Sequence, residues 1–301
     1  MAGRIINFIF FGNYFVGLLA VLLSIEMCLQ LDLPLNSPAY YILLFFAPIV
    51  YYTYAYKHYA EKTTPGNERS RWYHRHQNLV NISQVLLLIF SISVLVFLFI
   101  QFRNNFWNLP VYYFILMAGI GLLCLFYYGL FSIKLFGFNL RNTGWFKAFL
   151  IGFVWACCVS IFPIMMLDME GSNYDLDNII WLWFFVKNWM FCTVNAIMFD
   201  IKDYPTDANH QLRTFVVEFG LRKTIFFIII PLLILGLASF CFFAWQMRFS
   251  SVRFIINMLP FLLTLWLALT LARRRSILYY LVVIDGIIFF KAICGIIGSQ
   301  F

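Results

Sequence analysis

The chain has 301 residues, of which 63% are hydrophobic and 11% are charged, and its mean hydropathy is +0.85. A soluble domain has about a quarter of its residues charged, so this composition excludes an ordinary soluble enzyme and predicts an all-α protein that crosses a membrane several times. The net charge of +8 comes from basic residues between hydrophobic stretches, which argues against nucleic acid as a partner. The seven cysteines lie in apolar segments without a C-x-x-C pair, so we expect neither a disulfide framework nor a zinc site.

Nine apolar stretches follow one another along the chain, each near the ~20 residues that a membrane-crossing helix needs. We expect them to form one bundle in a single domain that covers residues 1–301. The first stretch lacks the small-residue site of a cleaved signal peptide, so we expect it to be the first span. The predicted spans are 6–27, 39–57, 79–101, 111–133, 146–167, 179–199, 224–246, 252–272 and 277–297.

Basic residues gather in alternate connections, after the second, fourth, sixth and eighth spans, whereas the other connections hold Arg103, Arg248 and Arg253. Because cytoplasmic loops carry the excess of Lys and Arg, we expect the N-terminus in the cytoplasm and the C-terminus outside, in a bacterial inner membrane. The connection after the fifth span is acidic, and we expect it to be a solvated outer loop. Its acidic residues are Asp168, Glu170, Asp175 and Asp177.

The connection after the second span is rich in basic and aromatic side chains. Such a loop could bind an anionic head group, although positive residues in this place commonly serve topology alone. Its histidines are too sparse to predict a metal site. The basic residues that the loop contributes are Lys57, Lys62, Arg69, Arg71 and Arg75.

Four charged residues, Glu26, Lys187, Asp285 and Lys291, fall inside or at the end of predicted spans. A charge at mid-membrane costs ~2.5–3.5 kcal/mol on insertion scales, so such side chains usually face the interior of the bundle and pair with one another. We expect Lys187 to form a structural ion pair with Asp285 or Glu26, and contact with a ligand is the alternative.

The most informative stretch begins where the sixth span ends and carries Asp200, Asp203 and Asp207. Their offsets of three and seven residues predict three carboxylates on one face of a helix. Carboxylates placed so closely repel one another unless they share a cation. Mg²⁺ is such a cation, since it binds through one or two carboxylates and completes its shell with water and phosphate, and Arg213 could hold a phosphate oxygen. A solvated loop without chemistry is the alternative.

These residues resemble the UbiA superfamily of intramembrane prenyltransferases. The run from Asp200 to Asp207, with Arg213 after it, resembles the second aspartate motif of that family. Residues 127–156 are similar to the family's connection between its fourth and fifth spans. The resemblance covers most of the chain loosely and residues 120–222 well.

The resemblance implies a UbiA-like fold and the transfer of an isoprenyl group from a diphosphate donor to a lipophilic acceptor, typically an aromatic ring. It implies Mg²⁺ as the cofactor, bound by Asp200, Asp203 and Asp207. It also implies that Lys202 and Arg213 contact the diphosphate.

The sequence departs from the family at the first aspartate motif, N-D-x-x-D-x-x-x-D at the end of the second span. The same spacing falls here on Tyr54, Lys57 and Glu61, so one acid remains and two facing metal clusters cannot be built. We therefore hypothesise that basic side chains supply the charge that a second metal would have brought. These side chains are Lys57, Arg69, Arg71 and Arg75.

Two functions from other classes also stay open. A non-catalytic binder of a polyprenyl or other lipid would keep the fold without the chemistry, and the residues Tyr54 and Lys57 favour it. The acidic run from Asp200 to Asp207 opposes it. An ion-coupled transporter that uses the charges inside the spans would predict an inverted repeat, which the sequence does not show.

Overall fold

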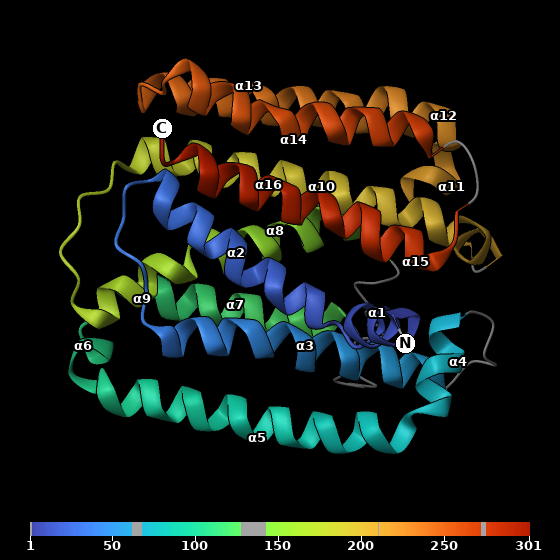
Figure 1. Ribbon diagram of the computed structural model, residues 1–301, viewed down its shortest axis with the longest axis horizontal. Coiled ribbons are helices and arrows are strands. Elements are labelled where there is room, and N and C mark those ends of the chain that lie inside the picture. Colours follow the sequence, from blue (N-terminus) through green and yellow to red (C-terminus); the bar gives the residue numbers. More distant parts are fainter. Residues whose placement is uncertain (1, 62–67, 128–142, 210, 272–274) are drawn as a thin grey trace.

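The structure is a computed structural model that describes residues 2–61, 68–127, 143–209, 211–271 and 275–301. It is 85% helical, with no strand among these residues, which confirms the all-α prediction. Most of the long helices lie side by side along a common direction (Figure 1). In chain order the elements are α1 (Ala2–Phe11), α2 (Tyr14–Gln30), α3 (Pro38–Glu61), α4 (Glu68–Arg75), α5 (Gln77–Gln101), α6 (Arg103–Trp107), α7 (Val111–Tyr127), α8 (Phe146–Ser160), α9 (Phe162–Glu170), α10 (Asn178–Asn209), α11 (Phe215–Phe219), α12 (Leu221–Thr224), the π-helix η2 (Ile225–Ile229), α13 (Ile230–Gln246), α14 (Ser251–Thr270), α15 (Ile277–Tyr279), the π-helix η3 (Tyr280–Ile284) and α16 (Asp285–Gly298).

Six helical segments in the described ranges are long and apolar enough to cross a membrane, and a seventh is reached if the bent pair α1–α2 counts as one span. The chain is therefore an integral membrane protein. Two of the predicted spans, 39–57 and 111–133, fall on α3 and on α7. The count of nine stays a prediction. The six segments are Gln77–Gln101, Phe146–Glu170, Asn178–Tyr204, Leu221–Gln246, Ser251–Thr270 and Ile277–Gly298.

The centre of the bundle is α10, which packs along α8 on one side and along α13 on the other. Gly152 of α8 faces Thr193 of α10, where an added Cβ would lie 2.7 Å from the Thr193 backbone nitrogen. This glycine lets the two helices approach closely and so fixes the distance between the residues at their adjoining ends. α16 packs between α2 and α14, whereas α5 packs against α3 and exposes most of its apolar side chains.

One end of the bundle gathers α4, α11, the last turns of α10 and the start of α15, and we call it the basic end (Figure 1, right). The opposite end carries the C-terminus and the acidic connection after α9. The prediction of a merely solvated acidic loop is wrong for two of its residues. Asp168 accepts hydrogen bonds from the hydroxyls of Tyr113, at 2.9 Å, and Tyr174, and Glu170 accepts one from the Ser37 backbone N–H, at 2.9 Å. These bonds hold the end of α9 against α7 and against the residue before α3.

Candidate functional site at the basic end

The three predicted aspartates lie on the last turns of α10, which continues as one helix of 32 residues beyond the membrane span. Asp200 and Asp207 are buried, at 4% and 6% exposure, although they belong to the polar end of the helix. The side chain of Asp203 is 47% exposed. The run is therefore divided between two carboxylates in the protein interior and one that reaches the surface.

Lys147, in the first turn of α8, joins the two buried carboxylates. Its Nζ lies 2.8 Å from Oδ1 of Asp200 and 3.4 Å from Oδ2 of Asp207. The lysine is itself buried, at 7% exposure. Sequence reasoning did not predict this role of Lys147. The available signal was its position, because a lysine just inside an apolar span must find a partner.

One carboxylate oxygen of this cluster, Oδ2 of Asp200, could bind Mg²⁺, whereas Lys147 already occupies the place between the two buried carboxylates. Oδ2 of Asp200 is buried without a hydrogen-bond partner in the described structure, as an atom that awaits a ligand would be. The place between Asp200 and Asp207, however, is taken by the Lys147 ammonium. Within the described ranges no group of three or more His, Cys, Asp or Glu side chains is placed to hold a metal ion. As the side chains stand, this site does not fit the predicted three-aspartate Mg²⁺ complex.

The two predicted diphosphate contacts after Asp200 differ in their surroundings. Lys202 forms an ion pair with Asp203, with an N–O distance of 3.3 Å, and its Nζ lies 5.5 Å from the centre of the Phe199 ring. The side chain of Arg213 is exposed. Its backbone carbonyl lies against Gly144, which has a positive φ of 68° just before α8. The segment after α10 is thus held beside the start of α8.

The basic residues predicted on α4 do not form one cluster. Arg69 is buried and turns toward the break between α1 and α2, where its Nη2 donates to Oδ1 of Asn13 at 2.7 Å. Its guanidinium also lies over the ring of Tyr56, 4.1 Å from the centre. Arg71 and Arg75 lie on another face of α4 and line a separate pocket. Arg69 therefore has a structural role in joining helices, whichever ligand the protein binds.

The residues at the first-motif positions lie in the last turns of α3. Tyr54 is exposed and Lys57 is half-buried. The side chain of Glu61 lies outside the described residues. Neither Tyr54 nor Lys57 carries a carboxylate.

Asp285, one of the two acids predicted as a partner for Lys187, lies at the basic end instead. It is 9% exposed and follows the π-helix η3 directly. Among the described residues it has neither a hydrogen bond nor an ion pair, while Arg69 and Lys202 interact with it electrostatically. Asn195 of α10 donates to the carbonyl of Ile284 at 2.9 Å and fixes this turn. Short π-helices are frequent at functional sites, and an unpaired carboxylate within a membrane span is itself a functional signal.

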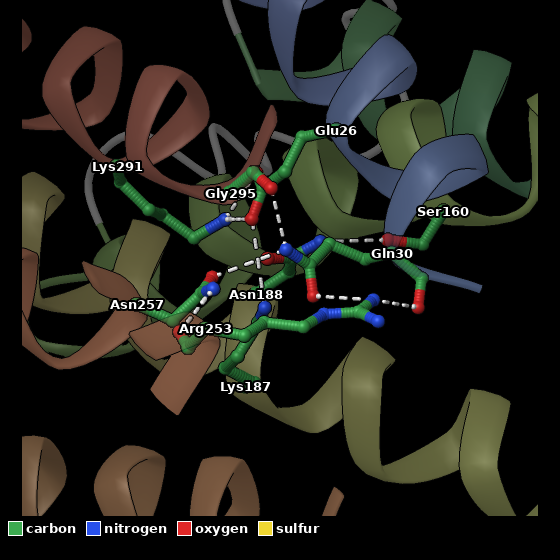
Figure 2. A network of polar contacts seen from close by, with 9 residues as sticks. All are labelled: Glu26, Gln30, Ser160, Lys187, Asn188, Arg253, Asn257, Lys291 and Gly295. Carbon is green, nitrogen blue, oxygen red and sulfur yellow. Dashed lines mark hydrogen bonds and ion pairs between the residues drawn. The ribbon is translucent and has the colours of Figure 1, made fainter. Parts of the chain in front are cut away.

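A second group of buried charges lies on α2, α10 and α16 (Figure 2). Nζ of Lys291 lies 2.6 Å and 2.9 Å from the two oxygens of Glu26, and Nζ of Lys187 lies 3.5 Å from one of them. The predicted ion pair of Lys187 is confirmed with Glu26 and is wrong for Asp285. Gln30 donates to the Gly295 carbonyl at 2.6 Å. The network joins α2, α10 and α16, so we interpret it as structural.

Comparisons of the chain with protein-family models, curated proteins and solved structures found no match.

Proposed function

We propose that this protein binds an isoprenyl diphosphate at its basic end and transfers the isoprenyl group to a lipophilic acceptor, as the resemblance to UbiA prenyltransferases implies. The observation that carries the proposal is the buried carboxylate of Asp200, paired through one oxygen with Lys147 and unpaired at the other. Burying an ionised group at a helix end is costly, and such groups cluster at functional sites.

The proposed transfer breaks the bond between C1 of the isoprenyl chain and a diphosphate oxygen, which keeps the electron pair. Lys202 and Arg213, which reach the surface beside this site, would stabilise the departing diphosphate as cations do in phosphoryl chemistry. C1 then forms a bond to the acceptor, which releases a proton. Asp285 is the candidate base because its carboxylate has no described partner. Asp200 and Asp207 would hold Lys147 in position.

Lys147 occupies the place between Asp200 and Asp207, two of the predicted Mg²⁺ ligands. The proposal therefore does not require Mg²⁺, and the experiment measures whether Mg²⁺ affects binding. The ammonium of Lys147 gives the carboxylates a permanent cation, so we assign no step to the metal. If Mg²⁺ does bind all three aspartates, Lys147 has to move away from them.

Non-catalytic binding of an isoprenyl lipid is the second candidate, and one observation favours it. Carboxylates that are neutralised by a lysine are poor metal ligands, and α3 offers Tyr54 and Lys57 where the family has acids. A protein of this kind would bind the diphosphate lipid and leave it intact.

The test is binding of a radiolabelled long-chain isoprenyl diphosphate to the purified protein in lipid nanodiscs, with and without Mg²⁺. We compare the wild type with Asp200→Asn, and we use Asp175→Asn as the control because Asp175 is exposed at the opposite end. The proposal expects Asp200→Asn to weaken binding about tenfold or more, which corresponds to about 1.4 kcal/mol, and expects the control to bind like the wild type.

Release of inorganic diphosphate on addition of a membrane lipid extract then separates the two candidates. Release by the wild type that Asp285→Asn lacks supports the transferase, whereas tight binding without release supports the carrier. Equal binding by the wild type and Asp200→Asn would remove the transferase, and an absence of binding by the wild type would remove both.

A further inference from the structure

A pocket of about 270 Å³ lies between α1 and α4, apart from the cluster around Asp200. Two arginines of α4, four residues apart and hence on one helical face, line one wall of it. An amide, two aromatic rings and one carboxylate complete the lining. The lining residues are Asn7, Phe11, Glu68, Arg71, Trp72 and Arg75.

The walls of this pocket are fixed by contacts behind them. Arg69, on the other side of α4, donates to Asn13, and the hydroxyl of Tyr73 donates to the carbonyl of Phe11 at 2.8 Å. Trp72 packs edge-on against the ring of Phe11, with ring centres 6.0 Å apart. These contacts hold α4 against α1 before any ligand arrives, which lowers the cost of binding.

The charge of the pocket is unbalanced. Arg71 and Arg75 are exposed, and neither forms an ion pair with Glu68 in the described part of the chain. Guanidinium groups match the oxygens of a phosphate in bidentate geometry, and the Asn7 amide adds a donor. Two cations and one carboxylate leave a net charge of +1, which suits a phosphate group of low charge.

The position of α1 indicates that the phosphate belongs to a lipid head group and is not free phosphate. α1 bends away from α2 by 63°, so it leaves the direction of the membrane spans. Ile5, Phe8 and Ile9 are exposed along it, which is typical of a helix lying in the membrane interface with its apolar face among acyl chains. The pocket beside α1 therefore opens at the level of lipid head groups.

We infer that this pocket binds the phosphate of an anionic membrane phospholipid, whose acyl chains lie against the apolar face of α1. The site is distinct from the proposed isoprenyl diphosphate site and does not depend on the proposed transfer. Arg71 and Arg75, which sequence reasoning assigned to the diphosphate, belong to the lipid site instead.

The experiment counts lipid molecules that stay bound to the detergent-purified full-length protein, by native mass spectrometry after addition of phosphatidylglycerol or phosphatidylcholine. We compare the wild type with the double variant Arg71→Lys/Arg75→Lys, which keeps the charge and removes the bidentate groups. The matched control is Arg222→Lys, an exposed arginine of α12 at the same end.

We expect the wild type and the control to retain phosphatidylglycerol about tenfold better than phosphatidylcholine, and the double variant to lose most of that preference. A preference that survives in the double variant would mean that general charge attraction holds the lipid, and would overturn the inference. So would a wild type without any preference. Displacement of phosphatidylglycerol by millimolar inorganic phosphate would assign the pocket to free phosphate and would also overturn it.

Discussion

Lys147 illustrates at the residue scale how a buried charge depends on its neighbours. Its ammonium lies between Asp200 and Asp207, and all three side chains are buried. Such a group is tolerated because each ion offsets the desolvation of the others, and it becomes costly when one member is removed. The pair formed by Lys202 and Asp203 differs, because both side chains are partly in solvent.

We predict that Lys147→Met destabilises the protein by about 3–5 kcal/mol, since two carboxylates lose their shared cation. The measurement is reversible unfolding in mixed micelles of mild detergent and dodecyl sulfate. Asp203→Asn is the control, and its effect should stay below about 1 kcal/mol because the Lys202–Asp203 pair is half-exposed. Equal effects of the two substitutions would contradict the buried pairing.

The network around Glu26 predicts substitutions of unequal effect. Glu26→Gln leaves Lys187 and Lys291 without their carboxylate, so we expect a loss of about 3 kcal/mol or more. Lys187→Met keeps the closer Glu26–Lys291 pair, at 2.6 Å, and removes the excess positive charge, so its effect should be small or stabilising. The same unfolding assay decides. A larger loss of unfolding free energy for Lys187→Met than for Glu26→Gln would contradict the assignment of Lys291 as the main partner of Glu26.

At the scale of elements, the pairing of α8 with α10 places the candidate site. Gly152 allows the close approach of these helices, and Lys147 lies about one turn before it on the same helix. The geometry of the charged residues is therefore set by a contact between two helix backbones, at a distance from the charges themselves.

We predict that Gly152→Ala costs about 1–3 kcal/mol, because the added methyl group would overlap Thr193 and push α8 away from α10. Gly119→Ala in α7 is the matched control, since an added Cβ there meets nothing within 4 Å. Thermal unfolding of both variants in detergent measures the difference. If they melt together, the close approach at Gly152 is not needed for stability.

Asp285, which follows the π-helix η3, is a residue whose replacement should affect stability and activity in opposite directions. Asp285 has no described partner, so Asp285→Asn removes a buried charge and should leave the melting temperature unchanged or raise it. If Asp285 is the base of the proposed transfer, the same substitution should lower diphosphate release about a hundredfold or more. A variant with lower stability and normal release would identify Asp285 as a structural residue.

At the scale of the whole molecule, the number of spans decides on which side each end lies. Nine spans place the two termini on opposite sides of the membrane, whereas six or eight place them on the same side. The positive residues predict an N-terminus in the cytoplasm and a C-terminus outside.

We predict that a C-terminal alkaline phosphatase fusion is active in a bacterial host and that a C-terminal green fluorescent protein fusion is dark. The phosphatase folds only outside the cytoplasm, where disulfides form. A fluorescent C-terminal fusion would mean an even number of spans and would contradict the predicted topology. Fusions after residue 175 provide the internal control, because the same topology places that residue outside.

Sequence periodicity and composition were sufficient to predict that the protein is all-α and that it lies in a membrane. Long apolar runs determine helices in a membrane because backbone polar groups there must be satisfied within the segment. The partner of Lys187 was predicted as one of two acids, and the choice between them needed the position of Glu26 on α2 relative to Lys187 on α10. Spacing along one chain cannot supply such a contact.

The candidate site was predicted in part. The three aspartates share one helix as expected, but their division into two buried side chains and one exposed side chain depends on Lys147 in α8. The basic residues of α4 look alike in sequence, yet Arg69 and Arg71 lie on different faces of a helix whose docking partner is far away in the chain. A helical wheel shows that the faces differ and does not show what each one meets.

The long exposed helix α5 has a consequence for the surrounding bilayer. Its 25 residues rise about 37 Å, whereas the 20 residues of α14 rise about 30 Å, which is the thickness of a typical hydrocarbon core. Because α5 presents apolar side chains to lipid along most of this length, acyl chains beside it must stretch or α5 must tilt. On this flank, the length of the lipid chains or the tilt of α5 therefore sets how the helix matches the bilayer.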